Sequence, residues 1–162
     1  MAELRTWAPT VTSVLASAEA CDRVGDLPGA CRVSPGEVAL VGDVSEAAVA
    51  AAVVRLDPDA VVLDVSDGWG AHSLDGPGSR EAFARLSELE LPMAGSLVGE
   101  VAGVGVRILV DRDRIDLLVP SMVSAHVHER IETDCSELLR LPVCCGRSGS
   151  SSSTSSGPAT TW

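Results

Sequence analysis

The stretch Val61–Leu91 constrains the fold more than any other part of this sequence, because two strand signals, a tight corner and a helix signal follow one another within it. Alternation of apolar residues at its start places Val61, Leu63 and Val65 on one face of a strand. A polar turn comes next, and residues 71–74 have the composition of a second, returning strand. The stretch therefore predicts a strand–turn–strand unit that leads into a helix.

The helix signal follows a corner of glycine and proline at residues 75–78, which interrupts a strand rather than extending it. Glu81 falls in the first helical turn, where the helix dipole favours a negative charge, and Pro92 ends the segment. The apolar positions recur at the three- and four-residue spacing of one helix face: Ala82, Phe83, Leu86 and Leu89. We expect this face to be buried, with Phe83 as its largest side chain.

A strand over residues 37–41 and a helix precede the central stretch. Asp43 and Glu46 stand at capping-box spacing at the start of this helix, and a proline after Asp57 ends it. Its predicted buried face consists of Val49, Val53 and Leu56.

Further strands and a last helix follow the central stretch. Residues 90–97 have the composition of a loop, 98–110 predict one or two strands, and 115–119 predict a hairpin partner across a charged turn. Ser121 is a suitable N-cap for the last helix. The inner stripe of that helix would be Val123, Val127, Ile131, Cys135 and Leu138.

The order of these elements predicts an α+β fold, with a mostly antiparallel sheet and helices on one face. The domain would span residues 36–142. Residues 1–35 have weak periodicity and predict an N-terminal arm with at most one short helix, ordered by packing on a partner. Residues 143–162 are rich in serine and cannot bury a core, so we expect a disordered tail.

The charge of the chain argues against two classes of partner. The sequence has 23 acidic residues against 12 basic ones, all of them Arg, and a formal net charge of −11. Such a surface repels nucleic acids and anionic membranes, and no segment approaches the ~20 apolar residues that a membrane span needs. The absence of Lys also excludes a lysine Schiff base within this chain.

Cysteine and histidine spacing predicts neither disulfides nor a metal site. Five cysteines without regular spacing do not form a disulfide framework. Reduced thiols, and a start that lacks the pattern of a signal peptide, predict a cytoplasmic protein. His126 and His128 are two residues apart, which turns them to different faces of a helix, whereas helical metal ligands stand four apart. We also find no Ser, His and Asp order that would indicate a catalytic residue.

Three residues of the central stretch are candidates for contact with a ligand or a partner: Asp64, Ser66 and Trp69. Asp64 and Ser66 end a strand beside a turn, where binding residues are often found, but an Asp in this place also commonly accepts backbone hydrogen bonds within the turn. Trp69 could anchor a partner or a ligand, or pack in the core under the loop. The sequence leaves these alternatives open.

Parts of the central stretch resemble a known family. The strand ending Asp64-Val65-Ser66, the strand ending Leu74-Asp75-Gly76-Pro77 and the helix Ala82-Phe83-Ala84-Arg85-Leu86 resemble the folate-binding domain of the glycine-cleavage aminomethyltransferase superfamily. Within that superfamily, the sequence is most similar to the gamma subunit of heterotetrameric sarcosine oxidase. The resemblance continues through the strands at 106–110 and 115–119 and implies the α+β fold of that domain.

The resemblance implies a place in a complex rather than a catalytic role. In sarcosine oxidase the alpha and beta subunits hold FAD, FMN, NAD and tetrahydrofolate, and the gamma subunit packs on its neighbours in an αβγδ assembly without a catalytic centre. The aminomethyltransferases carry an acidic pair beside the folate, and the corresponding residues 103–108 contain no acid. By this resemblance, the chain alone would bind none of these cofactors.

Three hypotheses follow for the function. The first is a non-catalytic, gamma-like subunit of a sarcosine oxidase-type complex, with alpha, beta and delta subunits as partners. The second is a stand-alone folate-binding protein of one-carbon metabolism, and the third is an assembly or regulatory module that has lost its ligand. A ligand-binding protein should keep polar groups that converge on a pocket, whereas a subunit should expose apolar surface. The high apolar content favours the subunit.

Overall fold

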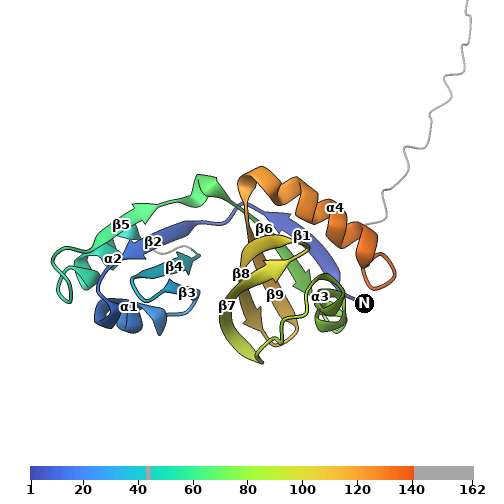
Figure 1. The fold of residues 1–162 in the computed structure, drawn as a ribbon, viewed down its shortest axis with the longest axis horizontal. Helices are drawn as coiled ribbons and strands as arrows, with labels where there is room; N and C mark the ends of the chain where they lie inside the picture. The colour runs from blue at the N-terminus through green and yellow to red at the C-terminus, as the bar shows by residue number, and fades with distance from the viewer. Residues whose placement is uncertain (43–44, 141–162) are drawn as a thin grey trace, which may run out of the picture.

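The computed structural model describes residues 1–42 and 45–140, which form two antiparallel sheets, each covered on one face by two helices (Figure 1). The four-stranded sheet has the order β3-β4-β2-β5 and the five-stranded sheet the order β1-β6-β9-β8-β7. The α+β fold with mostly antiparallel strands is confirmed, although the strands divide between two sheets. None of the described helices is long and apolar enough to cross a membrane.

The four-stranded sheet is built by the first half of the chain. Its elements are β2 (Val11–Leu15), α1 (Ala18–Gly25), β3 (Ala30–Ser34), β4 (Glu37–Val41), α2 (Glu46–Val53) and β5 (Val61–Asp64). Side chains alternate between the two faces of a strand, so Val14, Val38, Leu40 and Val62 point together toward the helices. There they form a core with Cys21, Val24, Val49 and Val53.

The five-stranded sheet carries the larger core. Its elements are β1 (Glu3–Trp7), β6 (Trp69–Asp75), α3 (Ser79–Leu86), β7 (Ala94–Val101), β8 (Val104–Asp111), β9 (Arg114–Pro120) and α4 (Ser124–Asp134), with single 3₁₀ turns at Ser66–Gly68 and Ser121–Val123. The centres of both predicted stripes are confirmed: Ala82, Phe83 and Leu86 of α3 are buried, as are Val127, Ile131 and Cys135 at α4. The outer members of the stripes lie beyond the helix ends and are only partly buried: Leu89, Val123 and Leu138. Phe83 is 1% exposed.

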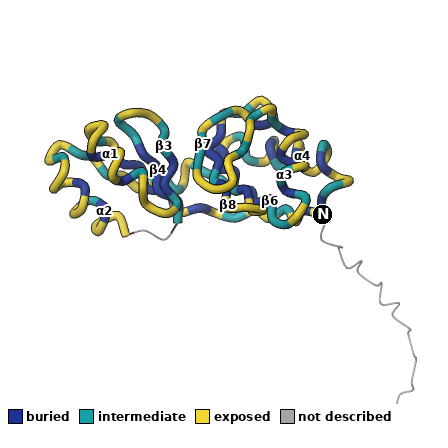
Figure 2. The backbone as a smooth tube through the Cα atoms, turned by 90° about the horizontal axis from the view of Figure 1, so that it is seen from below, coloured by how far each residue is buried: buried dark blue, intermediate teal, exposed yellow. Residues whose placement is uncertain are grey.

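The helix-free faces of the two sheets meet at their junction. Val11, Ala39 and Val41 from the four-stranded sheet pack on Leu118 of β9, with Trp69 at the margin. Strand β3 lies next to β7 and β8, and Figure 2 shows buried residues along β4 and β8. The chain crosses this junction twice, between β1 and β2 and between β5 and β6 (Figure 1).

The prediction of an N-terminal arm is wrong, because residues 1–35 supply β1, β2, α1 and β3 to the two sheets. The strands are only five residues long, and β1 is polar, so their apolar alternation is too short to be visible without the pairing partners. Ser17 caps α1 by accepting a hydrogen bond from Ala20 N at 3.4 Å. The predicted tail at 143–162 lies outside the described residues.

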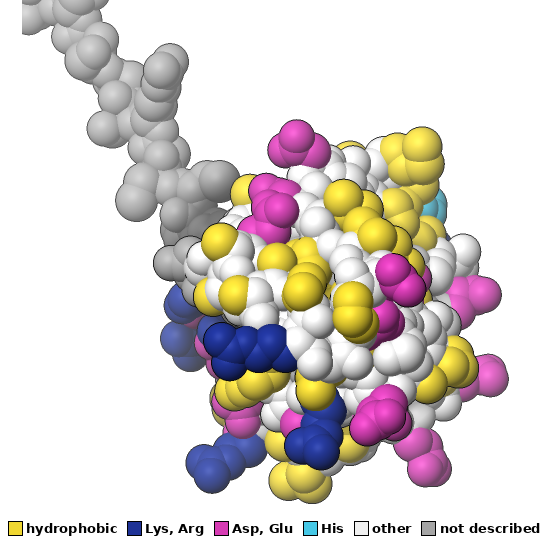
Figure 3. Space-filling model, turned by 90° about the vertical axis from the view of Figure 1, so that its left-hand side faces the viewer, with side chains coloured by type: hydrophobic (Ala, Val, Ile, Leu, Met, Phe, Trp, Pro, Cys, Tyr) yellow, Lys and Arg dark blue, Asp and Glu magenta, His cyan; other side chains and the backbone are white. Residues whose placement is uncertain are grey.

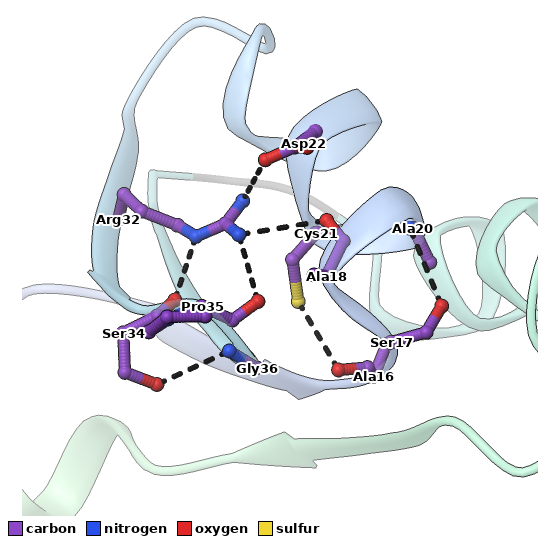
Figure 4. Close-up of polar contacts among 10 residues, drawn as sticks. All are labelled: Ala16, Ser17, Ala18, Ala20, Cys21, Asp22, Arg32, Ser34, Pro35 and Gly36. Atoms are coloured by element: carbon purple, nitrogen blue, oxygen red, sulfur yellow. Dashed lines mark hydrogen bonds and ion pairs between the residues drawn. The ribbon is translucent and has the colours of Figure 1, made fainter.

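Arg32 fastens this N-terminal helix to the turn after β3 (Figure 4). Its guanidinium lies 2.8 Å from the Asp22 carboxylate and donates to the Ser34 and Pro35 carbonyls at 2.6 and 2.7 Å. One side chain thus satisfies carbonyls of the turn and holds α1 at the same time. The local structure of residues 17–36 depends on this contact between segments, which no periodicity in the sequence reveals.

Strand pairing corrects the prediction for the central stretch. The strand at 71–74 was expected to return beside the strand at 61–65, but β5 pairs with β2 and β6 pairs with β1 and β9 in the other sheet. The face that carries Val61 and Leu63 points away from the helices, and these side chains are 46% and 45% exposed. Val62, on the opposite face, is partly buried against the helices instead.

Several element ends also differ from the prediction. The N-cap of α2 is Ser45, which accepts from Ala48 N, rather than the Asp43–Glu46 box, and Asp43 lies outside the described residues. Leu56 follows the end of α2 and is 51% exposed. Helix α4 begins at Ser124 after a 3₁₀ turn, and β7 begins at Ala94, inside the expected loop.

Candidate functional site at the junction of the two sheets

Asp64 and Ser66 close the turn that leads from β5 toward β6. The Asp64 carboxylate accepts from Ser66 N at 2.9 Å and from the Ser66 hydroxyl at 2.5 Å. Ser66 Oγ in turn accepts from Val11 N at 2.9 Å. These hydrogen bonds, from the side chain first and then from the backbone of Ser66, lower the pKa of Asp64 below its usual value. Both candidate residues therefore hold the crossing strands together at the junction, and the Asp64 carboxylate remains exposed.

Trp69, the third candidate, is half-buried beneath an arginine. The guanidinium carbon of Arg107 lies 4.2 Å from the centroid of the indole ring, which is the geometry of a cation–π contact. Arg107 Nη2 also lies 3.2 Å from Glu37 Oε1, and the same oxygen accepts from the Ser13 hydroxyl at 3.3 Å. The cluster therefore joins β6 and β8 of one sheet to β4 and β2 of the other.

Burial of Arg107 determines the electrostatics of this cluster. The side chain of Arg107 is 11% exposed, and burial lowers its pKa, while the charge of Glu37 opposes that shift. Its Nη1 is buried and has no hydrogen-bond partner in the described residues. A buried guanidinium with one carboxylate and one indole is stabilised only while all three stay in place. The cluster was not predicted, because its members come from four strands far apart in the sequence.

A second polar chain runs across the same face of the five-stranded sheet. Trp7 Nε1 donates to Ser73 Oγ at 2.8 Å, and the Ser73 hydroxyl donates to Asp116 Oδ1 at 2.5 Å. Arg114 Nε donates to both oxygens of the same carboxylate at 3.0 and 3.1 Å. Register explains the arrangement, because Ser73 pairs directly with Asp116 across β6 and β9.

This polar chain borders a hollow between the two sheets of about 730 Å³. The turn after α1 and the end of β4 form one side, and β7, β8 and β9 form the other. Gly29, with φ at 77°, packs so closely that an added Cβ would lie 2.3 Å from the Val41 carbonyl oxygen. Trp7 contributes an indole to the lining, and the polar side chains come from Asp26, Ser96, Asp111, Arg114 and Asp116. The hollow is open to solvent and large enough for a small organic molecule.

Two histidines, His72 and His128, lie together on the helix-covered face of the five-stranded sheet. His72, 1% exposed, stacks on His128 with ring centroids 5.4 Å apart, and the Thr6 hydroxyl lies within hydrogen-bond distance of Nδ1 of both rings. His72 Nε2 lies 3.1 Å from the Ser124 carbonyl oxygen. Burial, and then the charge of His128, lowers the pKa of His72. His126 is exposed, and residues 1–42 and 45–140 contain no group of three or more His, Cys, Asp or Glu placed to hold a metal ion.

The cysteines that the structure describes, Cys21, Cys31 and Cys135, are free and buried. Burial raises the pKa of Cys31 and Cys135. Thiols of this kind are unreactive. Cys144 and Cys145 lie outside the described residues.

Comparison with solved structures identifies the architecture. A chain of the heterotetrameric sarcosine oxidase from Corynebacterium sp. U-96, in complex with pyrrole 2-carboxylate, matches with a TM-score of 0.70 and 16% sequence identity, over 85% of this chain and 85% of that chain. The fold resembles that of a sarcosine oxidase subunit. At this identity the similarity concerns the fold, and it covers the two chains to the same extent.

Weaker similarities exist to aspartate kinases. The enzyme from Synechocystis matches with a TM-score of 0.47 and 13% identity, over 96% of this chain and 28% of that chain. The ligand-free regulatory subunit from Thermus thermophilus matches with a TM-score of 0.45 and 10% identity, over 83% and 99%. These similarities are too low to bear on the function. No protein-family model and no curated protein matches the sequence.

Proposed function

We propose that this chain is a non-catalytic, gamma-like subunit of a heteromeric sarcosine oxidase-type complex, which oxidises an N-methyl amino acid with flavin and tetrahydrofolate. The observation that carries the proposal is the match to a chain of a heterotetrameric sarcosine oxidase over 85% of both chains. The similarity extends over a chain of comparable length rather than over one domain of a larger enzyme. It is therefore the similarity expected between two subunits.

The use of polar side chains supports a non-catalytic role. Asp64 and Ser66 are engaged in the turn, and Arg107 is engaged with Glu37 and Trp69 across the junction. A catalytic group has to reach a substrate, whereas these side chains bind other residues of the same chain. FAD, FMN, NAD and tetrahydrofolate would then be held by the partner subunits, and none by this chain alone. The free cysteines fit a complex in the cytoplasm.

The exposed apolar surface supports a place in an assembly. Leu15, Leu56, Val61 and Leu63 are 41–51% exposed and all belong to the half of the chain that builds the four-stranded sheet. Figure 3 views this end of the molecule and shows hydrophobic side chains gathered on it, with acidic side chains around them on most sides and Arg side chains along one side. A partner subunit would bury such a surface.

Co-purification from the native cell tests the proposal. The tagged chain is expected to bring partner subunits with it, and the purified complex should show a flavin spectrum and oxidise sarcosine or a related N-methyl amino acid. The isolated chain, expressed alone, should show neither property. A chain that purifies alone from its native cell, or that carries a stoichiometric flavin by itself, would contradict the proposal.

The hollow between the sheets favours one alternative, a stand-alone folate-binding protein. Trp7 offers an indole, and Arg114 and Asp116 offer opposite charges, at the border of a space of about 730 Å³. Titration of the isolated chain with tetrahydrofolate, followed by tryptophan fluorescence, separates the two functions. Micromolar binding that Asp116→Asn abolishes would support the alternative, and absence of binding would support the subunit.

A further inference from the structure

The edge of the four-stranded sheet at β5 is open. Strand β5 pairs with β2 on one side, and no described strand lies on its other side. Val65 N–H donates to the Val11 carbonyl at 2.9 Å, so by the alternation of an antiparallel ladder the N–H and C=O groups of Val62 and Asp64 point outward. These groups can pair with an added strand.

The other sheet edges are covered or protected in ways that β5 is not. Strand β3 lies beside β7, and the Cys31 thiol donates to the Leu97 carbonyl between them. Strand β1 carries the ion pair of Glu3 and Arg5, a charged pattern typical of an edge that faces solvent. Strand β5 reads Val-Val-Leu-Asp, with no charge before its last residue, no proline and no bulge. An edge strand of this composition is able to pair with a strand of another polypeptide.

Apolar side chains continue from the open edge onto the helix-free face. Leu15 is the register partner of Val61, and Leu63 lies two residues further along the same face. These three side chains are 41%, 46% and 45% exposed. Together with the outward backbone groups of Val62 and Asp64, these three side chains form the surface that we call the β5 edge. An added strand with apolar residues at alternate positions would cover them.

The charge around the β5 edge selects the kind of strand that fits. Asp57 and Asp59 precede the strand, Asp64 ends it and Asp67 follows, while Arg55 is the one basic residue between positions 47 and 79. A second copy of the chain is unsuitable, because antiparallel pairing of β5 with itself would bring the acidic ends of both copies together without a counter-charge. The chain's own residues 141–162 are rich in serine and contain one Arg.

We propose that the β5 edge binds, by strand addition, an extended segment of a partner subunit that has alternating apolar residues flanked by Lys or Arg. This inference rests on the proposed function, since it names the surface through which the chain joins a complex. Backbone pairing with Val62 and Asp64 would give the affinity, and the flanking cations would pair with Asp59 and Asp67.

A peptide experiment on the full chain tests the edge without any knowledge of the partner. The probe is a synthetic peptide of alternating Val and Thr with two Lys at each end, and its matched control has Glu in place of Lys. We expect the Lys peptide to bind at least tenfold more tightly and to slow hydrogen exchange at the amides of Val62 and Asp64. Equal binding of the two peptides, or protection confined to other strands, would overturn the proposal.

Variants of the chain test the edge in the complex. Leu63→Arg adds a cation to the exposed face and should weaken recovery of the co-purifying partners at least tenfold, with an unchanged unfolding midpoint. Met122→Arg is the matched control, because Met122 is 89% exposed in the other half of the molecule, and it should leave recovery unchanged. If the wild-type chain recovers partners and Leu63→Arg recovers them equally, the edge proposal fails while the proposed function stands.

The remaining outcomes are also decisive. If the wild-type chain recovers no partner, the proposed function fails, and the peptide experiment still decides whether the edge accepts a basic strand. If the chain forms a dimer in solution that Leu63→Arg dissociates, the β5 edge is a contact between copies and the proposal is overturned.

Discussion

The guanidinium of Arg107 lies over the indole of Trp69, 4.2 Å from the ring centroid, and its Nη2 lies 3.2 Å from the Glu37 carboxylate of the other sheet. The indole therefore supports a partly buried ion pair across the junction, in which the Arg107 side chain is 11% exposed and the Glu37 side chain 27% exposed. Removing Trp69 or Glu37 leaves the buried Arg107 guanidinium with fewer partners, and such a loss costs more than an exposed ion pair contributes.

Trp69→Ala should lower the free energy of unfolding by about 2–3 kcal/mol, because it removes a half-buried aromatic and the cation–π contact with Arg107. Trp69→Phe keeps an aromatic face under the guanidinium and should retain more than half of that stability. Denaturant unfolding followed by circular dichroism measures both. An Ala variant as stable as the wild type would contradict the role of the indole at the junction.

Contact of Trp69 with a partner stays a prediction that the same variant can test. A tryptophan at the centre of an interface would cost ~2 kcal/mol of affinity when replaced by Ala. The measurement is partner affinity at a temperature where the variant is folded. Unchanged affinity would assign the indole to the fold alone.

Phe83→Ala should cost ~3–5 kcal/mol of unfolding free energy, as deletion of a buried Phe side chain usually does. Phe83 is 1% exposed at the centre of the larger core, between α3 and the five-stranded sheet. Met122→Ala, at a position 89% exposed, is the control and should change stability by less than ~0.5 kcal/mol. A loss below ~1 kcal/mol for Phe83→Ala would mean that this helix face is not packed as described.

Gly29→Ala should destabilise the fold by about 1–3 kcal/mol or more, for two reasons: φ is 77°, and the new Cβ would lie 2.3 Å from the Val41 carbonyl oxygen. Gly68→Ala is the matched control, since no atom lies within 4 Å of its added Cβ and its φ is not positive. Thermal unfolding of the two variants should separate them clearly. Equal midpoints would show that the turn between α1 and β3 can rearrange.

His72 should make stability depend on pH. Burial lowers its pKa in the folded chain below the ordinary histidine value of about 6.5, so between those two pKa values the unfolded chain binds more protons. The stabilisation linked to neutral His72 is complete above about pH 6.5. Below that pH the free energy of unfolding decreases as the pH falls toward the folded pKa. His72→Gln should flatten this dependence below about pH 6.5. An unchanged slope in His72→Gln would assign the dependence to other groups.

Local signals in the sequence predicted the parts of the fold that depend on neighbouring residues. The stripes of α3 and α4 were found because a buried helix face repeats every three or four residues, and Phe83 and Ile131 lie on those faces. The hairpin between β8 and β9 was found from its charged turn. The division into two sheets was not, since it depends on pairing between β2 and β5, which are far apart in the chain.

The site shows the same limit more strongly. Asp64 and Ser66 lie together as expected, because their contact spans two residues. The cluster of Arg107, Glu37 and Trp69 joins positions that are distant in sequence, and no spacing rule could have found it. The pairing of Leu15 with Val61 likewise became visible only with the sheet.

Because the chain passes twice between the two sheets, the two sheets do not correspond to two continuous halves of the sequence. A cut after Val65 would leave β1 in the first fragment, although its partner β6 lies in the second. The first fragment would keep all four strands of its own sheet and lose the surface on which Val11 and Val41 pack. We therefore expect neither half to fold as a module of its own.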